Sequence, residues 1–190
     1  MGYNVTDKGQ TVIALCHFPQ NMQAKNDEHY RLDVKDKYIT VSGGTPHAIF
    51  NGTQTLVSLL KKQTIPAKLE NIAINDYPDL LYRGMMLDIA RNFTKKADLL
   101  KLINQLAAYK INVLHFHFSD DEAWRLEIPG LEELTAIGSR RGFTEDESQC
   151  LYPVYYGGWN PNDTTATANG YYTREDFIEV LQYAAKRHIT

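Results

Sequence analysis

Residues 82–119 read YRGMMLDIARNFTKKADLLKLINQLAAYKINVLHFHFS, and this stretch decides the fold class. It begins with a compact apolar segment, 82–88, that predicts a strand, and continues into 96–109, where apolar residues share one face of a predicted helix. Its last part, 111–119, predicts a strand that is apolar on both faces, as expected of a parallel strand covered by helices. Because strand, helix and strand follow one another at this spacing, the sequence predicts a βαβ unit and an α/β fold.

A second helix follows a long irregular stretch that ends near Gly170. This helix is predicted over 174–187, with Thr173 and Asp176 in the arrangement of a capping box, and Ile189 would begin a third strand. No Gly-x-Gly-x-x-Gly motif follows either strand, so a dinucleotide-binding fold is not favoured. The pattern alone fits an open sheet and a closed barrel equally well.

The preceding part of the chain has a different pattern. Segments 11–18 and 30–41 are enriched in β-branched and aromatic residues, the second with a turn near Asp36, and together they predict an antiparallel sheet. A helix is predicted over 51–62, with Thr45-Pro46 upstream as an entry signal, and a short strand over 70–74. Sheet and helix arranged in this way indicate an α+β domain.

A turn-forming cluster, Asn-Asp-Tyr-Pro-Asp at 75–79, marks the predicted boundary between two domains. We therefore expect an α+β accessory domain over 1–76 and an α/β domain over 77–190, which a chain of 190 residues can accommodate.

Composition excludes several classes of partner. The formal charge is −3 and no block of Lys or Arg is longer than two residues, so neither nucleic acid nor an anionic membrane is an expected partner. No window approaches the ~20 apolar residues that span a bilayer, which predicts a soluble protein. The compartment stays open, with a secreted or periplasmic parent protein included.

Ionisable side chains gather where the two predicted strands end. In α/β folds the reactive groups lie at the carboxyl ends of parallel strands. The first strand runs into DIARN (88–92) and the second into HFHFSDDE (115–122). We therefore expect Arg91 and Asp120 to emerge on the same rim, where the guanidinium fork of Arg91 would suit two neighbouring sugar hydroxyls.

Each of these residues also has an ordinary structural explanation. Arg91 could form a surface salt bridge, and the acidic run that begins at Asp120 could be a solvated turn. His115 and His117 share one face of a strand, a spacing compatible with a metal site, but hydrogen-bonded barrel residues are the favoured explanation because no further His-rich spacing follows. Aromatic residues near the strand ends could stack on a pyranose or simply be buried; they are Trp124, Tyr152, Tyr155, Tyr156 and Trp159.

The chain resembles the family-20 glycoside hydrolases, the β-N-acetylhexosaminidases. The resemblance rests on YRGMMLDIARNF (82–93), INVLHFHFSDDEAWRLEIPGLEELTAIGSRRG (111–142) and GYYTREDFIEVLQYAAKRHI (170–189), in the order and spacing of the family. It implies the first two β/α units of a (β/α)8 TIM barrel, preceded by an accessory domain. The implied enzyme is a glycoside hydrolase that needs no cofactor.

The resemblance also assigns roles to residues. Arg91 matches the family arginine that binds the outer hydroxyls of the terminal N-acetylhexosamine. Asp120 matches an acidic residue that supports a histidine from a later strand. His115 and His117 are not metal ligands in the family. The implied partners are glycans or glycoconjugates that contain N-acetylhexosamine.

The implied reaction is hydrolysis of terminal, non-reducing N-acetylhexosamine residues with retention, assisted by the substrate's own acetamido oxygen. The catalytic Asp-Glu pair of the family belongs to a His-x-Gly-Gly-Asp-Glu type motif on a later strand, and these 190 residues contain no such motif. Asp121-Glu122 is not that pair, because it stands where the family usually has Asp-Gln. Asn92 likewise stands where His is common.

Two alternatives come from other classes. One is a glycan-binding or assembly module without catalysis, which titration of N-acetylglucosamine would separate from an inert scaffold. The other is a metal-dependent barrel hydrolase that uses His115 and His117, which a metal analysis without stoichiometric zinc would remove.

The 190-residue chain by itself is expected to be inactive, because it lacks the acid pair and because two strands cannot close an eight-stranded barrel. Its unpaired strand edges should lead to self-association or disorder. The check is hydrolysis of a chromogenic N-acetylglucosaminide by the purified chain, and turnover at an ordinary enzyme rate would show the expectation to be wrong.

Overall fold

The computed structural model describes residues 11–19, 22–61, 69–141, 153–157 and 162–190. The chain divides into two compact units: the first is Met1–Tyr82 with Ala108–Lys110, and the second is Arg83–Ala107 with Ile111–Thr190.

The first unit is organised by a β-hairpin. Strands β2 (Tyr30–Lys35) and β3 (Tyr38–Gly43) pair antiparallel, with Lys35 opposite Tyr38. Asp36 in the connecting turn has a φ of 55°, a left-handed conformation that aspartate tolerates better than most residues. The predicted turn near this residue is confirmed.

Two further strands complete a four-stranded sheet in the order β1-β3-β2-β4. Strand β4 (Ile72–Asp76) is antiparallel to β2, whereas β1 (Val12–His17) is parallel to β3. The expectation of a purely antiparallel sheet is therefore wrong at β1. The reason is that β2 occupies one side of β3, and the connection over 18–29 is long enough to carry the chain back so that both strands run in the same direction.

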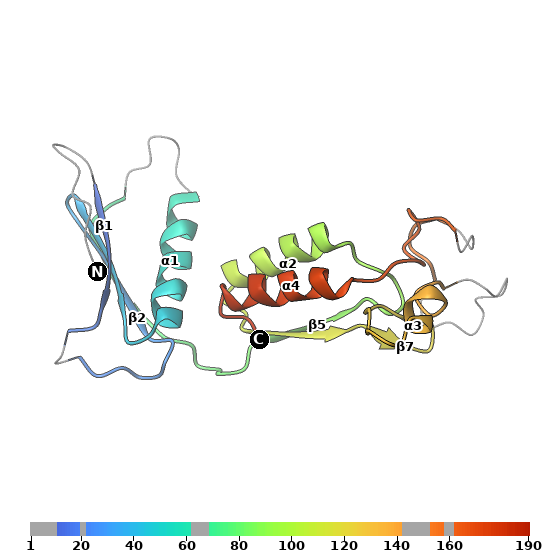
Figure 1. Ribbon diagram of the computed structural model, residues 1–190. Helices are drawn as coiled ribbons and strands as arrows, with labels where there is room; N and C mark the ends of the chain where they lie inside the picture. The colour runs from blue at the N-terminus through green and yellow to red at the C-terminus, as the bar shows by residue number, and fades with distance from the viewer. Residues whose placement is uncertain (1–10, 20–21, 62–68, 142–152, 158–161) are drawn as a thin grey trace. The chain divides into compact units, whose positions relative to one another are not determined.

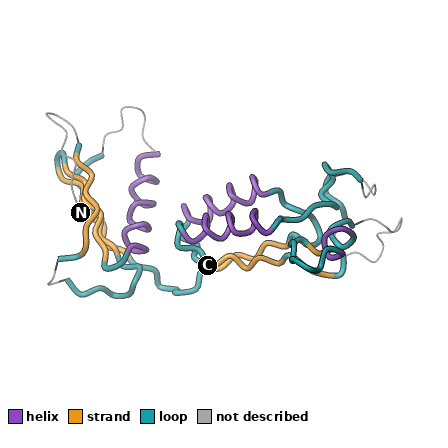
Figure 2. Tube along the Cα trace, viewed as in Figure 1, coloured by secondary structure: helices purple, strands orange, loops and turns teal. Residues whose placement is uncertain are grey.

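Helix α1 (Pro46–Lys61) covers one face of this sheet (Figures 1 and 2). It begins earlier than the predicted start at Asn51, because the Thr45 hydroxyl accepts a hydrogen bond from the Ala48 amide at 3.1 Å and proline is favourable at the first helical position. Helix and sheet enclose the core of the unit, formed by Tyr30, Leu32, Val34, Ile39, Val41, Ala48 and Leu56.

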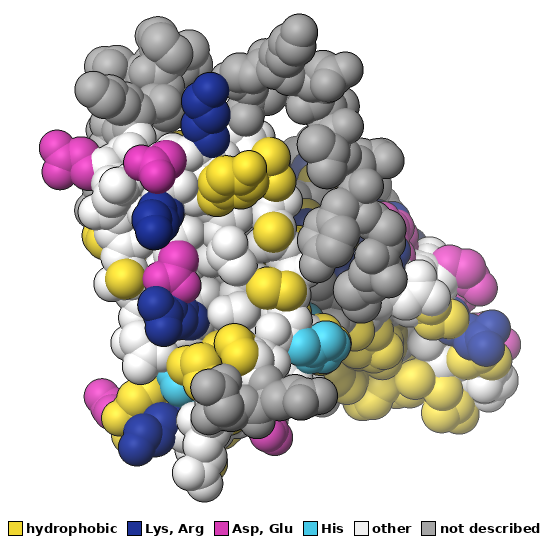
Figure 3. All heavy atoms as spheres, turned by 90° about the vertical axis from the view of Figure 1, so that its left-hand side faces the viewer, with side chains coloured by type: hydrophobic (Ala, Val, Ile, Leu, Met, Phe, Trp, Pro, Cys, Tyr) yellow, Lys and Arg dark blue, Asp and Glu magenta, His cyan; other side chains and the backbone are white. Residues whose placement is uncertain are grey.

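The opposite face of the sheet carries charged side chains of both signs beside hydrophobic ones (Figure 3). Arg31 and Asp33 on β2, for example, form an ion pair at 2.6 Å. Among the described helices of the chain, none has the length and apolar character needed to cross a membrane.

The second unit contains the predicted βαβ arrangement. Strand β5 (Gly84–Asp88) pairs parallel with β6 (Val113–His117). Helix α2 (Lys96–Ala108) connects them and lies beside α4 (Arg174–Ala185) over one face of the strands (Figure 1). The two helices are joined by an ion pair between Lys96 and Asp176 at 2.6 Å. The predicted α/β order and the capping box at Thr173 are confirmed.

The face of β5 and β6 opposite the two helices is exposed to solvent in the described part of the chain. Met86 and His115 are paired in the register, and Met86 is 56% exposed while His115 is also exposed. Coverage of β6 on both faces, expected from its apolar sequence, is therefore not seen. At the predicted third strand, Thr190 makes two backbone hydrogen bonds in a parallel pattern, at the start of β6. The Thr190 amide donates to the Asn112 carbonyl at 3.0 Å, and the Leu114 amide donates to the Thr190 carbonyl at 2.8 Å.

Substitution of Gly52 by alanine should destabilise the first unit. In an exposed helix the change would gain about 1 kcal/mol. Here a Cβ on Gly52 would lie 2.5 Å from Val41 Cγ1 and 2.8 Å from Tyr30 Cδ2, both in the packed core. Overpacking costs about 1–3 kcal/mol, so we expect a net loss of about 1 kcal/mol in the free energy of unfolding.

Urea unfolding measures the effect, with Ser58→Ala as the matched control, because Ser58 is an exposed position of the same helix. An increase in stability for Gly52→Ala would show that helix and sheet are less closely packed than described.

Candidate functional site

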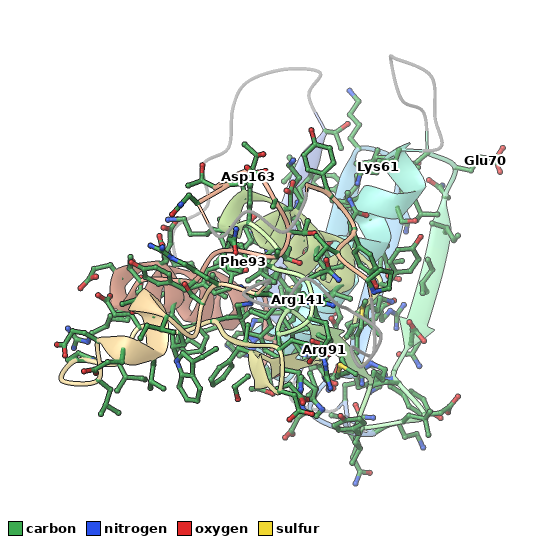
Figure 4. The ribbon with its side chains drawn as sticks, turned by 90° about the vertical axis from the view of Figure 1, so that its right-hand side faces the viewer. Lys61, Glu70, Arg91, Phe93, Arg141 and Asp163 are labelled. Carbon is green, nitrogen blue, oxygen red and sulfur yellow. The ribbon has the colours of Figure 1, made fainter. Side chains whose placement is uncertain are left out.

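The carboxyl ends of β5 and β6 lie next to each other. Asp88 at the end of β5 is paired with His117 at the end of β6, and the Ile89 amide donates to the His117 carbonyl at 3.0 Å, which extends the pairing by one residue. The loops that follow the two strands therefore start side by side. Figure 4 looks onto this end of the second unit, with Arg91 and Arg141 labelled.

A small hairpin contains the acidic residues 120–122 and places Glu122 next to Arg91, which follows β5. Strands β7 (Ser119–Asp120) and β8 (Ala123–Trp124) pair antiparallel, and Asp121 and Glu122 form the turn between them. The two carboxylates of the turn differ in their exposure to solvent. Asp121 is exposed, as in a solvated acidic turn, whereas the side chain of Glu122 is only 7% exposed.

Arg91 lies at the centre of a cluster of carboxylates, which we call the Arg91 cluster. Its Nη1 is 2.6 Å from Asp120 Oδ2 and 3.0 Å from Asp88 Oδ2, and its Nε is 2.7 Å from Glu122 Oε2. His117 Nε2 lies 2.6 Å from the same Asp120 oxygen. The structure thus places Arg91 and Asp120 in direct contact, on one rim of the strand pair.

Two members of the cluster, Arg91 and Asp120, have pKa values shifted in the direction that favours the charged form. Burial opposes the charge on Arg91, but the hydrogen bond that Arg91 donates to Asp88 and the negative charges of Glu122 and Asp88 outweigh it, so the pKa of Arg91 is raised. The pKa of Asp120 is lowered, first by the hydrogen bond from the Asp121 amide and then by the hydrogen bond from His117. An ionised aspartate between an arginine and an imidazole results.

The guanidinium of Arg91 is not fully used by these contacts. A guanidinium has five N–H donors in a fixed plane. The donors on Nε and Nη1 face Glu122, Asp88 and Asp120, while Nη2 makes no hydrogen bond within the described parts of the chain. With 15% of the side chain exposed, this edge can donate to an incoming oxygen.

The backbone around Arg91 is held by neighbouring side chains. Asp88 Oδ1 accepts from the amides of Ala90 at 2.9 Å and Arg91 at 3.2 Å, and Arg141 Nη1 donates to the Arg91 carbonyl. The carbonyls of Ile89 and Ala90 accept from the buried Arg125. The sequence interpretation missed Glu122, Arg125 and Arg141 as parts of this arrangement. Only Glu122 carried a signal, as a departure from the family pattern.

Asn92 organises the next part of the rim. Its Nδ2 donates to the Pro153 carbonyl at 3.0 Å, and its Oδ1 accepts from the Tyr155 amide at 2.9 Å and the Thr167 hydroxyl at 2.7 Å. The residue that stands where the family commonly has His is therefore a buried anchor for the loop that follows.

The candidate aromatic residues differ in position. Trp124 packs edge-on against Phe118, with ring centroids 6.0 Å apart, and its indole N–H donates to the Leu126 carbonyl, so it is a packing residue. Tyr155 and Tyr156 are exposed. Tyr152 and Trp159 lie outside the described residues.

The two histidines of β6 do not form part of a metal-ligand group in the described residues, where no cluster of three or more His, Cys, Asp or Glu could hold an ion. Their rings lie 6.4 Å apart, and His117 is engaged with Asp120.

Comparisons with known proteins agree over nearly the whole chain. The family model "Glycosyl hydrolase family 20, domain 2" matches residues 2–77, and "Glycosyl hydrolase family 20, catalytic domain" matches residues 80–190.

Among curated relatives, beta-hexosaminidase B of Pseudoalteromonas piscicida is 42% identical over 165 residues, which are 87% of this chain and 21% of that protein. N,N'-diacetylchitobiase of Vibrio harveyi is 39% identical over 160 residues, or 84% of this chain and 18% of that protein. The chain thus spans about a fifth of the length of these relatives.

Solved structures give the same result. The GH20 exo-β-N-acetylglucosaminidase from Vibrio harveyi, in complex with N-acetylglucosamine, aligns with a TM-score of 0.76 and 34% identity, over 94% of this chain and 26% of that one. The GH20 β-N-acetylhexosaminidase from Streptomyces coelicolor A3(2) aligns with a TM-score of 0.75 and 30% identity, over 96% and 33%.

Substitution of Asp120 by asparagine should lower stability in a pH-dependent way. Because the pKa of Asp120 is lower in the folded chain than its usual value of 3.8, its ionised form stabilises the fold above that value. The contribution is lost as the pH falls through the lowered pKa. The free energy of unfolding of the wild type should exceed that of Asp120→Asn near neutral pH, and the difference should shrink as the pH falls below 3.8.

Urea titrations at several pH values measure this difference. Asp121→Asn is the matched control, since Asp121 is an exposed carboxylate in the same turn. A difference that stays constant with pH would contradict the assignment of Asp120 to the Arg91 cluster.

Proposed function

The chain belongs to glycosyl hydrolase family 20, and on that premise we propose that it forms the sugar-holding part of a β-N-acetylhexosaminidase, which hydrolyses terminal, non-reducing N-acetylhexosamine residues with retention. The observation that carries this proposal is the Arg91 cluster, in which an arginine fixed by three carboxylates keeps one edge available to a ligand. The substrates would be glycans or glycoconjugates that contain N-acetylhexosamine.

Arg91 is proposed to bind the outer hydroxyls of the terminal sugar. The two N–H groups of Arg91 Nη2 face no described acceptor, so each can donate to a hydroxyl oxygen of the sugar. Because Glu122, Asp88 and Asp120 already fix the plane of the guanidinium, little side-chain entropy is lost when the sugar binds.

Asp120 is proposed to support the reaction centre through an imidazole. In the second unit it already lies 2.6 Å from His117 Nε2, and its lowered pKa keeps it ionised at neutral pH. An ionised carboxylate of this kind can orient a histidine from a later strand, the role that the family resemblance implies. His117 then ties Asp120 to β6.

The bond-breaking groups are proposed to come from outside these 190 residues. In substrate-assisted hydrolysis the acetamido oxygen attacks the anomeric carbon while an aspartate orients the amide and a glutamate protonates the leaving oxygen. No His-x-Gly-Gly-Asp-Glu motif is present here to supply that pair. The second unit would contribute sugar recognition, not proton transfer.

Residues 77–190, which include the second unit, are further proposed to be the first two β/α units of a (β/α)8 barrel, with the domain boundary at 76/77. Three observations support this architecture: the parallel pairing of β5 with β6, the two helices on one face, and the backbone hydrogen bonds that Thr190 makes at the start of β6. In a barrel, the face that carries Met86 and His115 would point to the interior.

Substitution of Arg91 by lysine in the full-length protein should lower kcat/KM for a chromogenic N-acetylglucosaminide by about 10- to 150-fold. A lysine keeps the charge but offers no fork, so hydrogen bonds from a charged donor, worth about 1.5–3 kcal/mol, are lost. The measurement is steady-state hydrolysis of the chromogenic substrate.

Arg187→Lys is the control, because Arg187 stacks on Tyr183 at the end of α4 and touches none of the cluster. Equal rates for Arg91→Lys and the wild type would remove Arg91 from the sugar site. A wild-type protein that binds N-acetylglucosamine without cleaving the chromogenic substrate would favour a glycan-binding module.

A further inference from the structure

Arg125 is a completely buried arginine that follows strand β8, with a relative exposure of 0%. Its backbone is fixed on both sides, because its amide donates to the Phe118 carbonyl and its carbonyl accepts from the Tyr172 amide, each at 2.9 Å. The side chain therefore starts from a rigid position between two segments of the second unit.

Within the described residues, all the hydrogen bonds of the Arg125 guanidinium go to main-chain carbonyls. Its Nε faces Ile89 at 3.0 Å and Ala90 at 3.3 Å, and its Nη2 faces Ala90 at 2.9 Å and Ala168 at 3.0 Å. Its Nη1 faces Ser139 at 2.7 Å and Gly170 at 3.1 Å. Every nitrogen is thus engaged, and one cation joins three separate stretches of backbone: 89–90, 139 and 168–170.

No carboxylate forms an ion pair with Arg125 among the described residues. Its charge is balanced by carbonyl dipoles, and burial, followed by the nearby charge of Arg141, lowers the pKa of Arg125 to about 10. A buried cation of this kind is costly, and apolar packing of similar volume often gives equal or greater stability. Stability alone is therefore a weak explanation for an arginine at this position.

Two of the carbonyls that Arg125 binds, those of Ile89 and Ala90, lie immediately before Arg91. From the other side, Asp88 Oδ1 accepts from the amides of Ala90 and Arg91. The peptide groups of 89–91 are therefore hydrogen-bonded to Arg125 on one side and to Asp88 on the other. Asp88 also forms an ion pair with the Arg91 side chain at 3.0 Å. The orientation of this short segment sets where the Arg91 guanidinium lies.

We propose that Arg125 is a positioning residue for sugar recognition: by binding the Ile89 and Ala90 carbonyls it fixes the backbone from which Arg91 reaches the substrate. The proposal rests on the proposed function of Arg91. Lysine cannot replace Arg125, because a point charge with three donors on a flexible stem cannot span carbonyls in three segments at fixed angles.

The experiment is a double-mutant cycle in the full-length protein, with Arg125→Lys, Arg91→Lys and the combined variant, assayed on a chromogenic N-acetylglucosaminide. Arg125→Lys should lower kcat/KM by about 10²-fold, the order of loss that follows a small misplacement of a binding group. In the Arg91→Lys background the same change should cost less than about twofold, because the group that it positions is already gone.

Arg140→Lys is the matched control, since Arg140 is an exposed arginine near the same loops, and it should leave kcat/KM unchanged. Losses that add independently in the double variant would show that Arg125 has a purely structural role and would overturn the proposal. Wild-type levels of activity in Arg125→Lys would overturn it as well.

Folding and function are separated by further measurements. Near-ultraviolet circular dichroism and thermal melting establish that each variant is folded, and Arg125→Gln, which keeps an amide donor, replaces Arg125→Lys if the latter is not. Failure of both variants to fold would assign Arg125 to the stability of the unit and overturn the proposal.

An inactive wild-type protein would instead contradict the proposed hydrolysis. The same cycle is then measured by titration with N-acetylglucosamine, where coupling between positions 125 and 91 supports the positioning role. If the wild type does not bind N-acetylglucosamine, the proposed positioning role of Arg125 is wrong.

Discussion

The parallel register between β5 and β6 is the constraint from which the rest of the second unit follows. It places Asp88 opposite His117, so that both strands end at the same level and their loops begin next to each other. A shift of one residue would turn every side chain of the shifted strand to the opposite face. The register is fixed by the helices on one face, where Phe116 stacks on Phe177 of α4 with ring centroids 6.3 Å apart.

The rim that this register creates is built by two arginines with opposite environments. Arg91 is surrounded by carboxylates near the surface, whereas Arg125 is enclosed by carbonyl groups in the interior. The first arrangement holds a side chain in place while leaving donors for a ligand, and the second holds backbone segments together. Recognition and support are thus divided between two residues of the same chemistry, linked by the peptides of 89–91.

Much of the second unit follows from sequence periodicity, and less of the first. The helical spacing over 96–109 and the apolar segment 111–119 give α2 and β6 to within two residues, because local pattern and burial agree there. The direction of β1 differs from the expected antiparallel one, since strand pairing depends on contacts far apart in the sequence. The early start of α1 depends on the Thr45 cap, whose weight the sequence does not reveal.

In the candidate site too, some contacts can be predicted from the sequence and others cannot. The contact between Arg91 and Asp120 follows from two strand ends meeting on one rim, which topology predicts. Arg125 was not predicted, because a single arginine between Trp124 and Leu126 gives no sign that it will be buried. Its partners are carbonyl oxygens, which every residue has and no sequence pattern marks. The roles of Arg91 and Asp120 in a reaction stay predictions.

The buried anchor Asn92 has a practical consequence for producing the protein. Asn92-Phe93-Thr94 is an acceptor sequence for N-linked oligosaccharide, yet the amide nitrogen that would be modified donates to the Pro153 carbonyl. Only an unfolded chain could receive the oligosaccharide, and the modified side chain would then exclude Pro153 and Thr167 from their places. In a eukaryotic secretory host, molecules that carry the oligosaccharide would therefore lack the Asn92 hydrogen bonds to Pro153 and Thr167. In a bacterial host the side chain would stay unmodified and these bonds would form.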